Sequence, residues 1–383
     1  MKALFVVPPL VGHTLPTVSI AAALRARGWE VAWAGHPESL ARLLPPGAEV
    51  WSLGELPAEV ERSIAERSRR LRGLESVQFL WQDFLVPLAR ATGPLLERLL
   101  GERSPDVVVV DQQALGGALA ARRLGARWAT LCTTSASLVS PLAAFPKVAA
   151  WIDAQLAALQ EDVGLPVLAA PDLSPELVLL LSTRALIGDK PLPPQVRLVG
   201  PAFGDRPDAT PMPRLGPGRR VLVSLGTVSA ERGGGFFRAV VEAFAGTDLQ
   251  AILVAPPDLV GAVPDNVVVA ERVPQLALLA HVDAVVTHGG HNTVCEALAH
   301  GLPLVVAPIR DDQPVVAQQV VDAGCGVRVR FGGLSGATLR AALTRVLDDP
   351  TFRAAAGRVR GSFADAGGAP EAARLIAALA GRG

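Results

Sequence analysis

The segment 287–303, THGGHNTVCEALAHGLP, concentrates residue types that bind anions. Gly289 and Gly290 permit positive φ and let a ligand approach the backbone closely. Asn292 and Thr293 then open a predicted helix, and the unpaired N–H groups at a helix N-terminus attract phosphate. We therefore expect a diphosphate group at this helix end.

Two further side chains of this segment extend the expected ligand from a diphosphate to a nucleoside diphosphate. His288 is an additional donor for the phosphates, and Glu296, one helical turn on, can accept hydrogen bonds from a ribose diol. An ordinary strand–turn–helix junction with Asn292 as its cap is the alternative. A cap explains Asn292 or Thr293, whereas two histidines, two glycines and a glutamate together favour the ligand site.

A candidate acid–base pair consists of His13, in PPLVGHTLPTVS, and Asp111, at the end of the apolar run VVVV. Each follows a predicted strand, and a histidine there can act as a general base near neutral pH. A carboxylate behind an imidazole fixes its tautomer and stabilises the imidazolium. The pair forms only if the two strands lie near each other; otherwise Asp111 is a cap for the predicted helix 113–124.

Two other strand exits carry weaker candidates. Asp312 and Gln313 follow the apolar run 303–307, and a carboxylate with an amide can grip two hydroxyls of a sugar. A helix N-cap at Asp312, with Pro314 in the first turn, explains the same residues and is compatible with sugar binding. Thr227 ends the motif SLGT, which fits a phosphate loop and a plain βα turn equally well.

The candidates share a position, because each follows a short apolar run that does not alternate with polar residues, as at 107–110, 221–225 and 284–287. Strands buried on both faces have this composition, as in parallel sheets covered by helices. Helical patterns lie between the runs, which predicts doubly wound α/β architecture, twice over. Ligands of such sheets bind beyond the carboxyl ends of the strands, where the candidates lie.

A segment dense in Pro and Gly, GPAFGDRPDATPMPRLGPG, marks the boundary between two domains. We predict a first domain over 1–200, a linker over 201–218, a second domain over 219–368 and a terminal helix over 369–383 that could return to the first domain. The two domains are both of ordinary size.

The composition of the 383-residue chain excludes several classes of protein. Half of the residues are hydrophobic and 19% are charged, which excludes a disordered chain. The 36 basic residues balance the 36 acidic ones and tyrosine is absent, which disfavours a nucleic-acid partner. With three distant cysteines and no signal-like or membrane-spanning segment, we expect a cytoplasmic protein, either monomer or homodimer.

Absent motifs narrow the chemistry further. The chain has no GxGxxG after a predicted strand, no Walker A lysine motif, no HExxH and no GxSxG. It also lacks an Asp-x-Asp pair for a metal that would hold a diphosphate. We therefore expect no cofactor and no metal site, and we expect the protein's own donors to stabilise a departing diphosphate.

The segment 272–326 resembles the donor-binding signature of the GT-B family 1 glycosyltransferases, which include the bacterial macrolide and natural-product enzymes. GHTLP at 12–16, VVVVD at 107–111 and SLGT at 224–227 are similar to other motifs of that family. The resemblance implies two facing Rossmann-like domains joined by a linker. It places the acceptor in the N-terminal domain and the nucleotide sugar in the C-terminal domain.

Carried over residue by residue, the resemblance implies a complete donor site. His288 would contact the pyrophosphate, and Glu296 would hold the ribose hydroxyls. The other implied donor-binding residues are Thr227, Gly290, Asn292 and Thr293 at the phosphates, Val273 and Gln275 beside the nucleobase, and Asp312 and Gln313 at the sugar. Plant relatives have Trp at the positions of Val273 and His291 and Asn at that of Val316, so uridine and thymidine both stay open as the base.

The resemblance also makes His13 the catalytic base and Asp111 its partner. It implies inverting transfer of a hexose from a UDP- or dTDP-linked sugar to a hydroxyl of a small lipophilic natural product. Phe79, Trp81 and Phe84 are candidate walls of the acceptor site, although aromatics at helical spacing also fit a plain core. A non-catalytic nucleotide-sugar-binding homologue or partner protein and a GT-B sugar-nucleotide epimerase are the alternatives.

Overall fold

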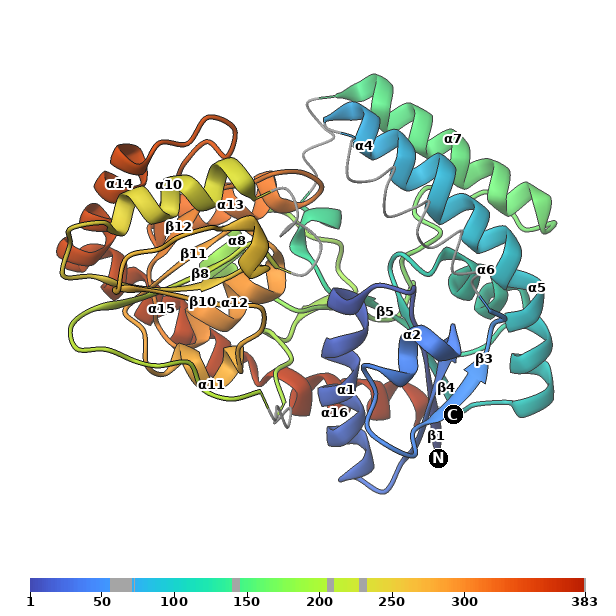
Figure 1. The fold of residues 1–383 in the computed structure, drawn as a ribbon. Coiled ribbons are helices and arrows are strands. Elements are labelled where there is room, and N and C mark those ends of the chain that lie inside the picture. The colour runs from blue at the N-terminus through green and yellow to red at the C-terminus, as the bar shows by residue number, and fades with distance from the viewer. Residues whose placement is uncertain (56–70, 72, 140–144, 205–209, 227–232, 382–383) are drawn as a thin grey trace. The chain divides into compact units, whose positions relative to one another are not determined.

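The structure is a computed structural model that describes the chain except residues 56–70, 72, 140–144, 205–209, 227–232 and 382–383. It divides into two compact units (Figure 1). The first comprises Met1–Ser182, Lys190–Asp205 and Ala366–Gly383, and the second comprises Thr183–Asp189 and Arg206–Asp365. Every helix in the described residues is too short or too polar to cross a bilayer.

The first unit is built on a parallel sheet of seven strands in the order β3-β2-β1-β4-β5-β6-β7. The strands are β1 (Lys2–Val6), β2 (Glu30–Gly35), β3 (Glu49–Ser52), β4 (Val107–Asp111), β5 (Trp128–Cys132), β6 (Val178–Leu180) and β7 (Val196–Leu198). The strand order reverses between β1 and β4, which pair from Ala3↔Val107 to Val6↔Val110. At such a switch point the loops leave the sheet in opposite directions and open a ligand crevice.

The valine run of β4 explains its place in the middle of this sheet. Val107 and Val109 pack into the core on one face, and Val108 and Val110 pack into the core on the other. A strand buried on both faces needs no polar residues between its apolar ones.

Helices cover both faces of the first sheet. The helices α1 (Val11–Arg25) and α16 (Gly368–Ala380) pack together in one core, and α5 (Val86–Arg103) and α6 (Leu115–Arg123) pack in the other (Figure 1). The other described helical segments of this unit are α2 (Pro37–Ala41), α4 (Leu74–Gln78), a π-helical segment Phe79–Leu85, a 3-10 turn Ser135–Ser137 and α7 (Pro146–Asp162). The C-terminal helix α16 and the N-terminal helix α1 thus belong to the same hydrophobic core.

The second unit repeats the architecture with six parallel strands in the order β10-β9-β8-β11-β12-β13. The strands are β8 (Arg220–Ser224), β9 (Gln250–Val254), β10 (Val267–Ala270), β11 (Ala284–Thr287), β12 (Leu304–Val306) and β13 (Gly326–Arg328). Its described helices are α8 (Arg184–Ile187), α10 (Gly234–Phe244), a 3-10 turn Pro257–Leu259, α11 (Gln275–Leu279), α12 (His291–Ala299), α13 (Gln313–Asp322), α14 (Gly336–Asp348) and α15 (Pro350–Ala366). The predicted doubly wound α/β fold is confirmed in both units.

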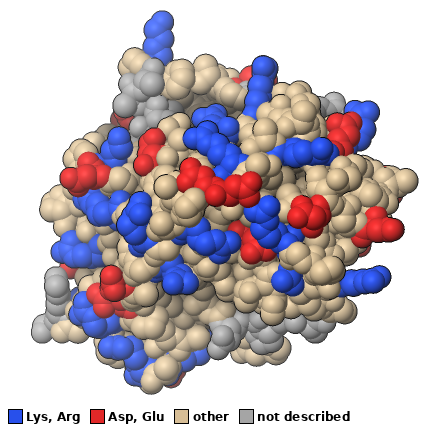
Figure 2. Space-filling view, turned by 90° about the vertical axis from the view of Figure 1, so that its left-hand side faces the viewer, with Lys and Arg blue, Asp and Glu red and all other residues tan. Residues whose placement is uncertain are grey.

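Charged side chains of both signs lie on the face of the molecule that Figure 2 draws. Figure 2 shows Lys and Arg interspersed with Asp and Glu on the face it draws, in line with a net charge of +0. A chain with this balance of charge lacks the positive excess that is typical of nucleic-acid binders.

Candidate active site

His13 and Asp111 lie side by side at the switch point of the first sheet. Asp111 is the last residue of β4, and His13 lies in the first turn of α1, after the loop that leaves the neighbouring strand β1. Nδ1 of His13 is 2.9 Å from both carboxylate oxygens of Asp111. The structure therefore brings together the two residues that the sequence nominates as an acid–base pair.

The hydrogen bond between them sets the chemistry of the imidazole. A carboxylate only accepts hydrogen bonds, so Nδ1 of His13 carries the proton and donates it, and Nε2 keeps its lone pair. The side chain of Asp111 is 0% exposed, whereas that of His13 is 15% exposed. A partly exposed imidazole with a buried carboxylate behind it is the arrangement of a general base.

Asp111 also fulfils part of its alternative, structural role. Its Oδ1 accepts a hydrogen bond of 2.9 Å from the backbone N–H of Gln113. The helix α6 begins only at Leu115, and its N-cap, Ala114, has no side-chain oxygen. Asp111 therefore holds the turn that precedes the helix as well as the imidazole.

Thr133, which the sequence analysis did not single out, completes the group. Its Oγ1 is 2.9 Å from Nδ1 of His13 and donates to Oδ2 of Asp111 over 3.3 Å. Thr133 follows β5, which pairs with β4, so its hydroxyl leaves the sheet beside Asp111. The only signal in the sequence was a hydroxyl residue directly after a predicted strand.

The three aromatic residues predicted to line the acceptor site lie in the π-helical segment. Phe79 is buried, and Trp81 and Phe84 are half-buried and pack against an apolar cluster formed by α5, α6 and α7. Core packing accounts for these contacts. Their role as acceptor walls stays a prediction.

In the second unit, β11 ends at Thr287 and the next three residues turn the chain into α12. Gly289 has φ +89°, and a Cβ there would lie 2.8 Å from Val306. Gly290 is the N-cap of α12. It has no side chain, so it makes no side-chain hydrogen bond to the first N–H groups of the helix. Asn292 therefore lies inside the first turn, and the alternative in which Asn292 caps the helix is wrong.

His288 is enclosed by glycines at this turn. A Cβ at Gly226 would lie 2.8 Å from Cε1 of the ring, and one at Gly290 would lie 2.7 Å from Nε2. Burial and, to a smaller extent, the nearby charge of Arg310 lower the pKa of His288 to about 4, against a hydrogen bond with the backbone of Ser224 that raises it. The ring is therefore neutral at pH 7 and carries one N–H donor.

The residues expected at the nucleoside lie together. Nε2 of Gln275, the first residue of α11, donates to Oε2 of Glu296 over 2.6 Å. Glu296 is buried in α12, and Val273 is buried two residues before Gln275. The helix α12 thus carries half-buried Asn292 and Thr293 at its N-terminus and the expected ribose acceptor one turn later.

Asp312 and Gln313 lie at the start of α13, which follows β12. Oε1 of Gln313 accepts hydrogen bonds from the backbone N–H groups of Ile309 and Arg310, at 2.9 and 3.0 Å. Asp312 is the N-cap of α13 but makes no side-chain cap bond. The amide of Gln313 therefore holds the loop through its oxygen, and its nitrogen carries the donors that could meet a sugar.

The structure does not test two of the predictions about this site, the role of Thr227 and the independence of metal and cofactor. Thr227 falls in the stretch 227–232, outside the described residues. Within the residues that are described, no group of three or more His, Cys, Asp or Glu side chains could hold a metal ion. The expected independence of metal and cofactor stays a prediction.

Comparison with known proteins identifies the chain. Residues 239–379 match the family model described as Erythromycin biosynthesis protein CIII-like, C-terminal domain. The chain is 31% identical to 4'-demethylrebeccamycin synthase of Lentzea aerocolonigenes, across 96% of this chain and 97% of that protein. The chain belongs to the natural-product glycosyltransferases. It is also 30% identical to demethyllactenocin mycarosyltransferase of Streptomyces fradiae, across 98% of this chain and 86% of that enzyme.

Solved structures agree with this assignment. The glycosyltransferase of kitacinnamycin is 28% identical, with a TM-score of 0.81 over 99% of this chain and 98% of that one. A glycosyltransferase from Streptomyces nogalater is 27% identical, with a TM-score of 0.77 over 100% of both chains. The predicted GT-B fold of this glycosyltransferase is confirmed.

Proposed function

We propose that this glycosyltransferase transfers a hexose from a UDP- or dTDP-linked sugar to a hydroxyl of a small lipophilic natural product, with inversion at the anomeric carbon. His13 removes the proton of the acceptor hydroxyl, and the acceptor oxygen then attacks the anomeric carbon. The bond from that carbon to the diphosphate breaks, and the nucleoside diphosphate leaves from the opposite side.

The contact of 2.9 Å between His13 and Asp111 carries the proposal. Asp111 holds Nδ1–H, so Nε2 of His13 has the lone pair that a base requires, and the carboxylate stabilises the imidazolium that forms. General-base catalysis of this kind contributes about 10²- to 10⁴-fold to the rate. The name of one relative, a mycarosyltransferase, describes transfer of a sugar and supports the same reaction class.

The N-terminus of α12 supports the proposed leaving group. Gly290 supplies no side-chain cap to the helix, and the ring of His288 lies against this glycine. Preorganised donors aimed at the oxygens where negative charge develops lower the barrier, and losing one typically costs about 3 kcal/mol. Metal-independent departure of the diphosphate and a cytoplasmic location are further parts of the proposal.

His13→Ala provides the test. We expect the variant to bind UDP or dTDP as the wild type does and to lose turnover by about 10²-fold or more. Calorimetry measures binding and single-turnover chromatography measures transfer, each with and without EDTA. Full turnover by the variant, with chemistry rate-limiting, would refute the base, and loss of activity in EDTA would refute metal independence.

The same incubations separate the proposal from its alternatives. An epimerase converts the nucleotide sugar without any acceptor, and a non-catalytic homologue binds it without converting it. The proton coupling at the anomeric carbon of the product, measured by NMR, reports whether the configuration has inverted. Stabilisation by UDP, dTDP or GDP in thermal unfolding identifies the nucleobase, since a ligand at 100 times its Kd stabilises by about 2.7 kcal/mol.

A further inference from the structure

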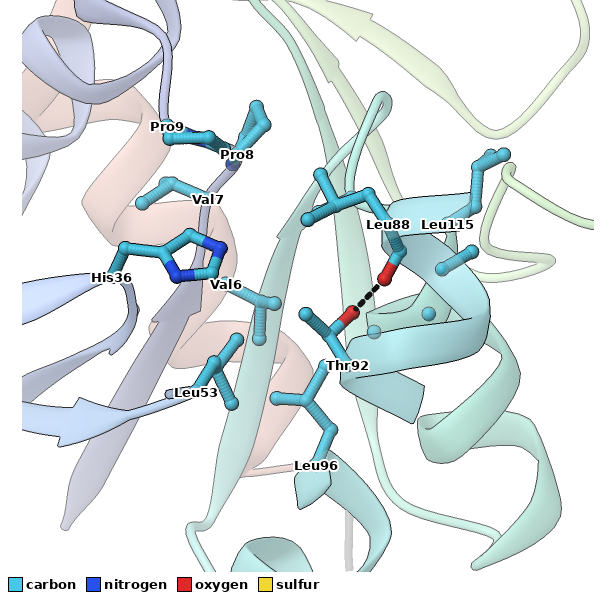
Figure 3. Close-up of a pocket in the computed structure, with 14 residues that line it drawn as sticks. Val6, Val7, Pro8, Pro9, His36, Leu53, Leu88, Thr92, Leu96 and Leu115 are labelled. Carbon is cyan, nitrogen blue, oxygen red and sulfur yellow. Dashed lines mark hydrogen bonds between the residues drawn. The ribbon is translucent and has the colours of Figure 1, made fainter. Parts of the chain in front are cut away.

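A small hollow in the first unit lies at the carboxyl ends of strands β1, β2 and β3. Its walls come from the ends of β1, β2 and β3, from α5 and from the turn that opens α6 (Figure 3). The β1 side includes Pro9, four residues before His13, and the α6 side includes Ala114, three residues after Asp111. Along the chain, these lining residues therefore lie three or four positions from the proposed base and its partner.

His36 is the polar feature of this hollow, which we call the His36 pocket. The residue follows β2, and in Figure 3 its ring points toward Val6 and the side chains of α5. It is 7% exposed, and among the described residues its Nε2 has no hydrogen-bond partner. A buried polar atom without a partner costs free energy, which a bound group that reaches it would recover.

The tautomer of His36 determines what that group must be. Nδ1 lies 3.1 Å from the carbonyl oxygen of Gly54. A carbonyl only accepts, so Nδ1 carries the hydrogen and Nε2 presents a lone pair. In this tautomer Nε2 can only accept a hydrogen bond, so it requires a donor such as a hydroxyl.

The rest of the wall is apolar and the space is small. Its lining includes leucine side chains at 53, 88 and 96, and the hydroxyl of Thr92 already donates to the carbonyl of Leu88 over 2.7 Å. The interior has room for about one water molecule, which is the size of one hydroxyl group. Leu88 and Pro9 are half-buried, so the body of a larger molecule can lie over them.

We propose that the His36 pocket receives one hydroxyl of the acceptor, distinct from the hydroxyl that is glycosylated, and that this hydroxyl donates to Nε2 of His36. His36 is then a specificity residue that selects acceptors carrying a second hydroxyl and orients them toward His13. This inference rests on the proposed transferase function. A site built to pair with a hydroxyl rejects the analogue that lacks the donor, because its own polar atom is left unpaired.

The test pairs two substitutions with two kinds of probe. His36→Asn keeps a donor near Gly54 but has no atom at the position of Nε2, whereas His36→Gln reaches that position. His281→Asn, at an exposed histidine outside the pocket, is the control. The probes are dihydroxynaphthalenes and the matching methoxynaphthols, in which one hydroxyl can no longer donate.

For at least one isomer we expect the wild type, His36→Gln and His281→Asn to prefer the dihydroxy probe by about 10- to 100-fold in kcat/KM. His36→Asn should show no preference. Hydrolysis of the nucleotide sugar without acceptor should be equal in all four proteins. A wild type that neither hydrolyses the nucleotide sugar nor transfers its sugar would count against the proposed function. An equal preference for the dihydroxy probe in His36→Asn and wild type would overturn the proposed role of the pocket.

A second measurement does not depend on turnover. In protein labelled with [¹⁵N]histidine, the Nε2 resonance of His36, identified by its absence in His36→Asn, should move when a dihydroxynaphthalene is added and stay in place with dimethoxynaphthalene. If no hydroxylated probe moves the resonance at saturation, the pocket holds a water molecule only and the inference is wrong. If the enzyme glycosylates none of the naphthol probes, this NMR measurement alone tests the inference.

Discussion

At the scale of single residues, the group formed by His13, Asp111 and Thr133 determines which nitrogen of the imidazole can take a proton. Strand exits identify His13 and Asp111, because residues that leave a parallel sheet at its carboxyl edge can converge. The sequence does not identify Thr133, because hydroxyl residues follow many strands for structural reasons. Only the pairing of β4 with β5 brings its Oγ1 within 3.3 Å of Asp111.

Asp111→Asn tests the role of the carboxylate. An amide can donate to Nδ1 of His13 and so favours the tautomer with the hydrogen on Nε2, which cannot accept the acceptor's proton. We expect kcat to fall by about 10²- to 10⁴-fold, with nucleotide affinity unchanged. Thr133→Val, which removes one hydrogen bond of 3.3 Å, should cost about 10-fold or less, and a larger loss than that of Asp111→Asn would contradict the assignment.

The pKa of His288 predicts a pH dependence of stability. Burial holds this pKa at about 4 in the folded protein, against 6.5 as its ordinary value. Between these values the unfolded chain binds the proton and the folded protein does not, so stability falls as the pH drops through the window. We expect wild type to lose up to about 2 kcal/mol more than His288→Gln between pH 7 and pH 5, measured by urea unfolding. Identical losses in both proteins would show that the folded ring is not held neutral.

At the scale of elements, the turn between β11 and α12 combines a left-handed residue, Gly289, with a helix capped by glycine. The glycines and the helix could be predicted from composition, because positive φ and close approach both favour glycine. The N-cap could not, since Asn292 is the better capping type and the structure uses Gly290. A glycine cap adds no side chain of its own at the helix N-terminus.

Gly290→Ala should weaken nucleotide binding more than it weakens the fold. Its φ of −60° suits alanine, but the added Cβ would lie 2.7 Å from Nε2 of His288 and displace the ring. We expect the Kd of UDP or dTDP to rise by about 10-fold or more, measured by calorimetry, through loss of about one charge-assisted hydrogen bond. Gly357→Ala, in open space on α15, is the matched control and should leave the Kd unchanged.

The π-helical segment Phe79–Leu85 is an element that periodicity could not reveal. The sequence pattern of these residues fits an ordinary α-helix. A π-helix differs from an α-helix by only about one residue per turn, so the apolar pattern is nearly the same over seven residues. The consequence is local, since Trp81 and Phe84 pack against the cluster of α5, α6 and α7.

At the scale of the whole molecule, the number and type of the layers could be predicted and the order of strands could not. Continuous apolar runs indicate parallel strands, but neighbours in the sheet depend on how each helical crossover folds back. The pairing of β1 with β4, and of β8 with β11, is therefore information that only the structure supplies. Both candidate sites lie at these two reversals of strand order.

Ile376→Ala tests how far the first unit depends on α16. Ile376 is fully buried in the core shared with α1, so the substitution should cost about 2–5 kcal/mol. Leu124→Ala, at a leucine that is 46% exposed in the same unit, should change stability by about 0.5 kcal/mol or less. Urea unfolding followed by tryptophan fluorescence measures both, and equal small effects would mean that α16 contributes little to the first unit.

The path of the chain has a consequence for engineering. The backbone crosses from one unit to the other after Ser182, Asp189, Asp205 and Asp365. A single cut in the chain therefore cannot separate the two units intact. A hybrid gene with one junction near the linker would combine the N-terminal portion of one parent with the α16 of the other. Chimaeras designed to exchange acceptor preference between relatives should therefore take residues 366–383 from the same parent as the N-terminal portion. Otherwise α1 and α16 come from different parents and their packing in the shared core is mismatched.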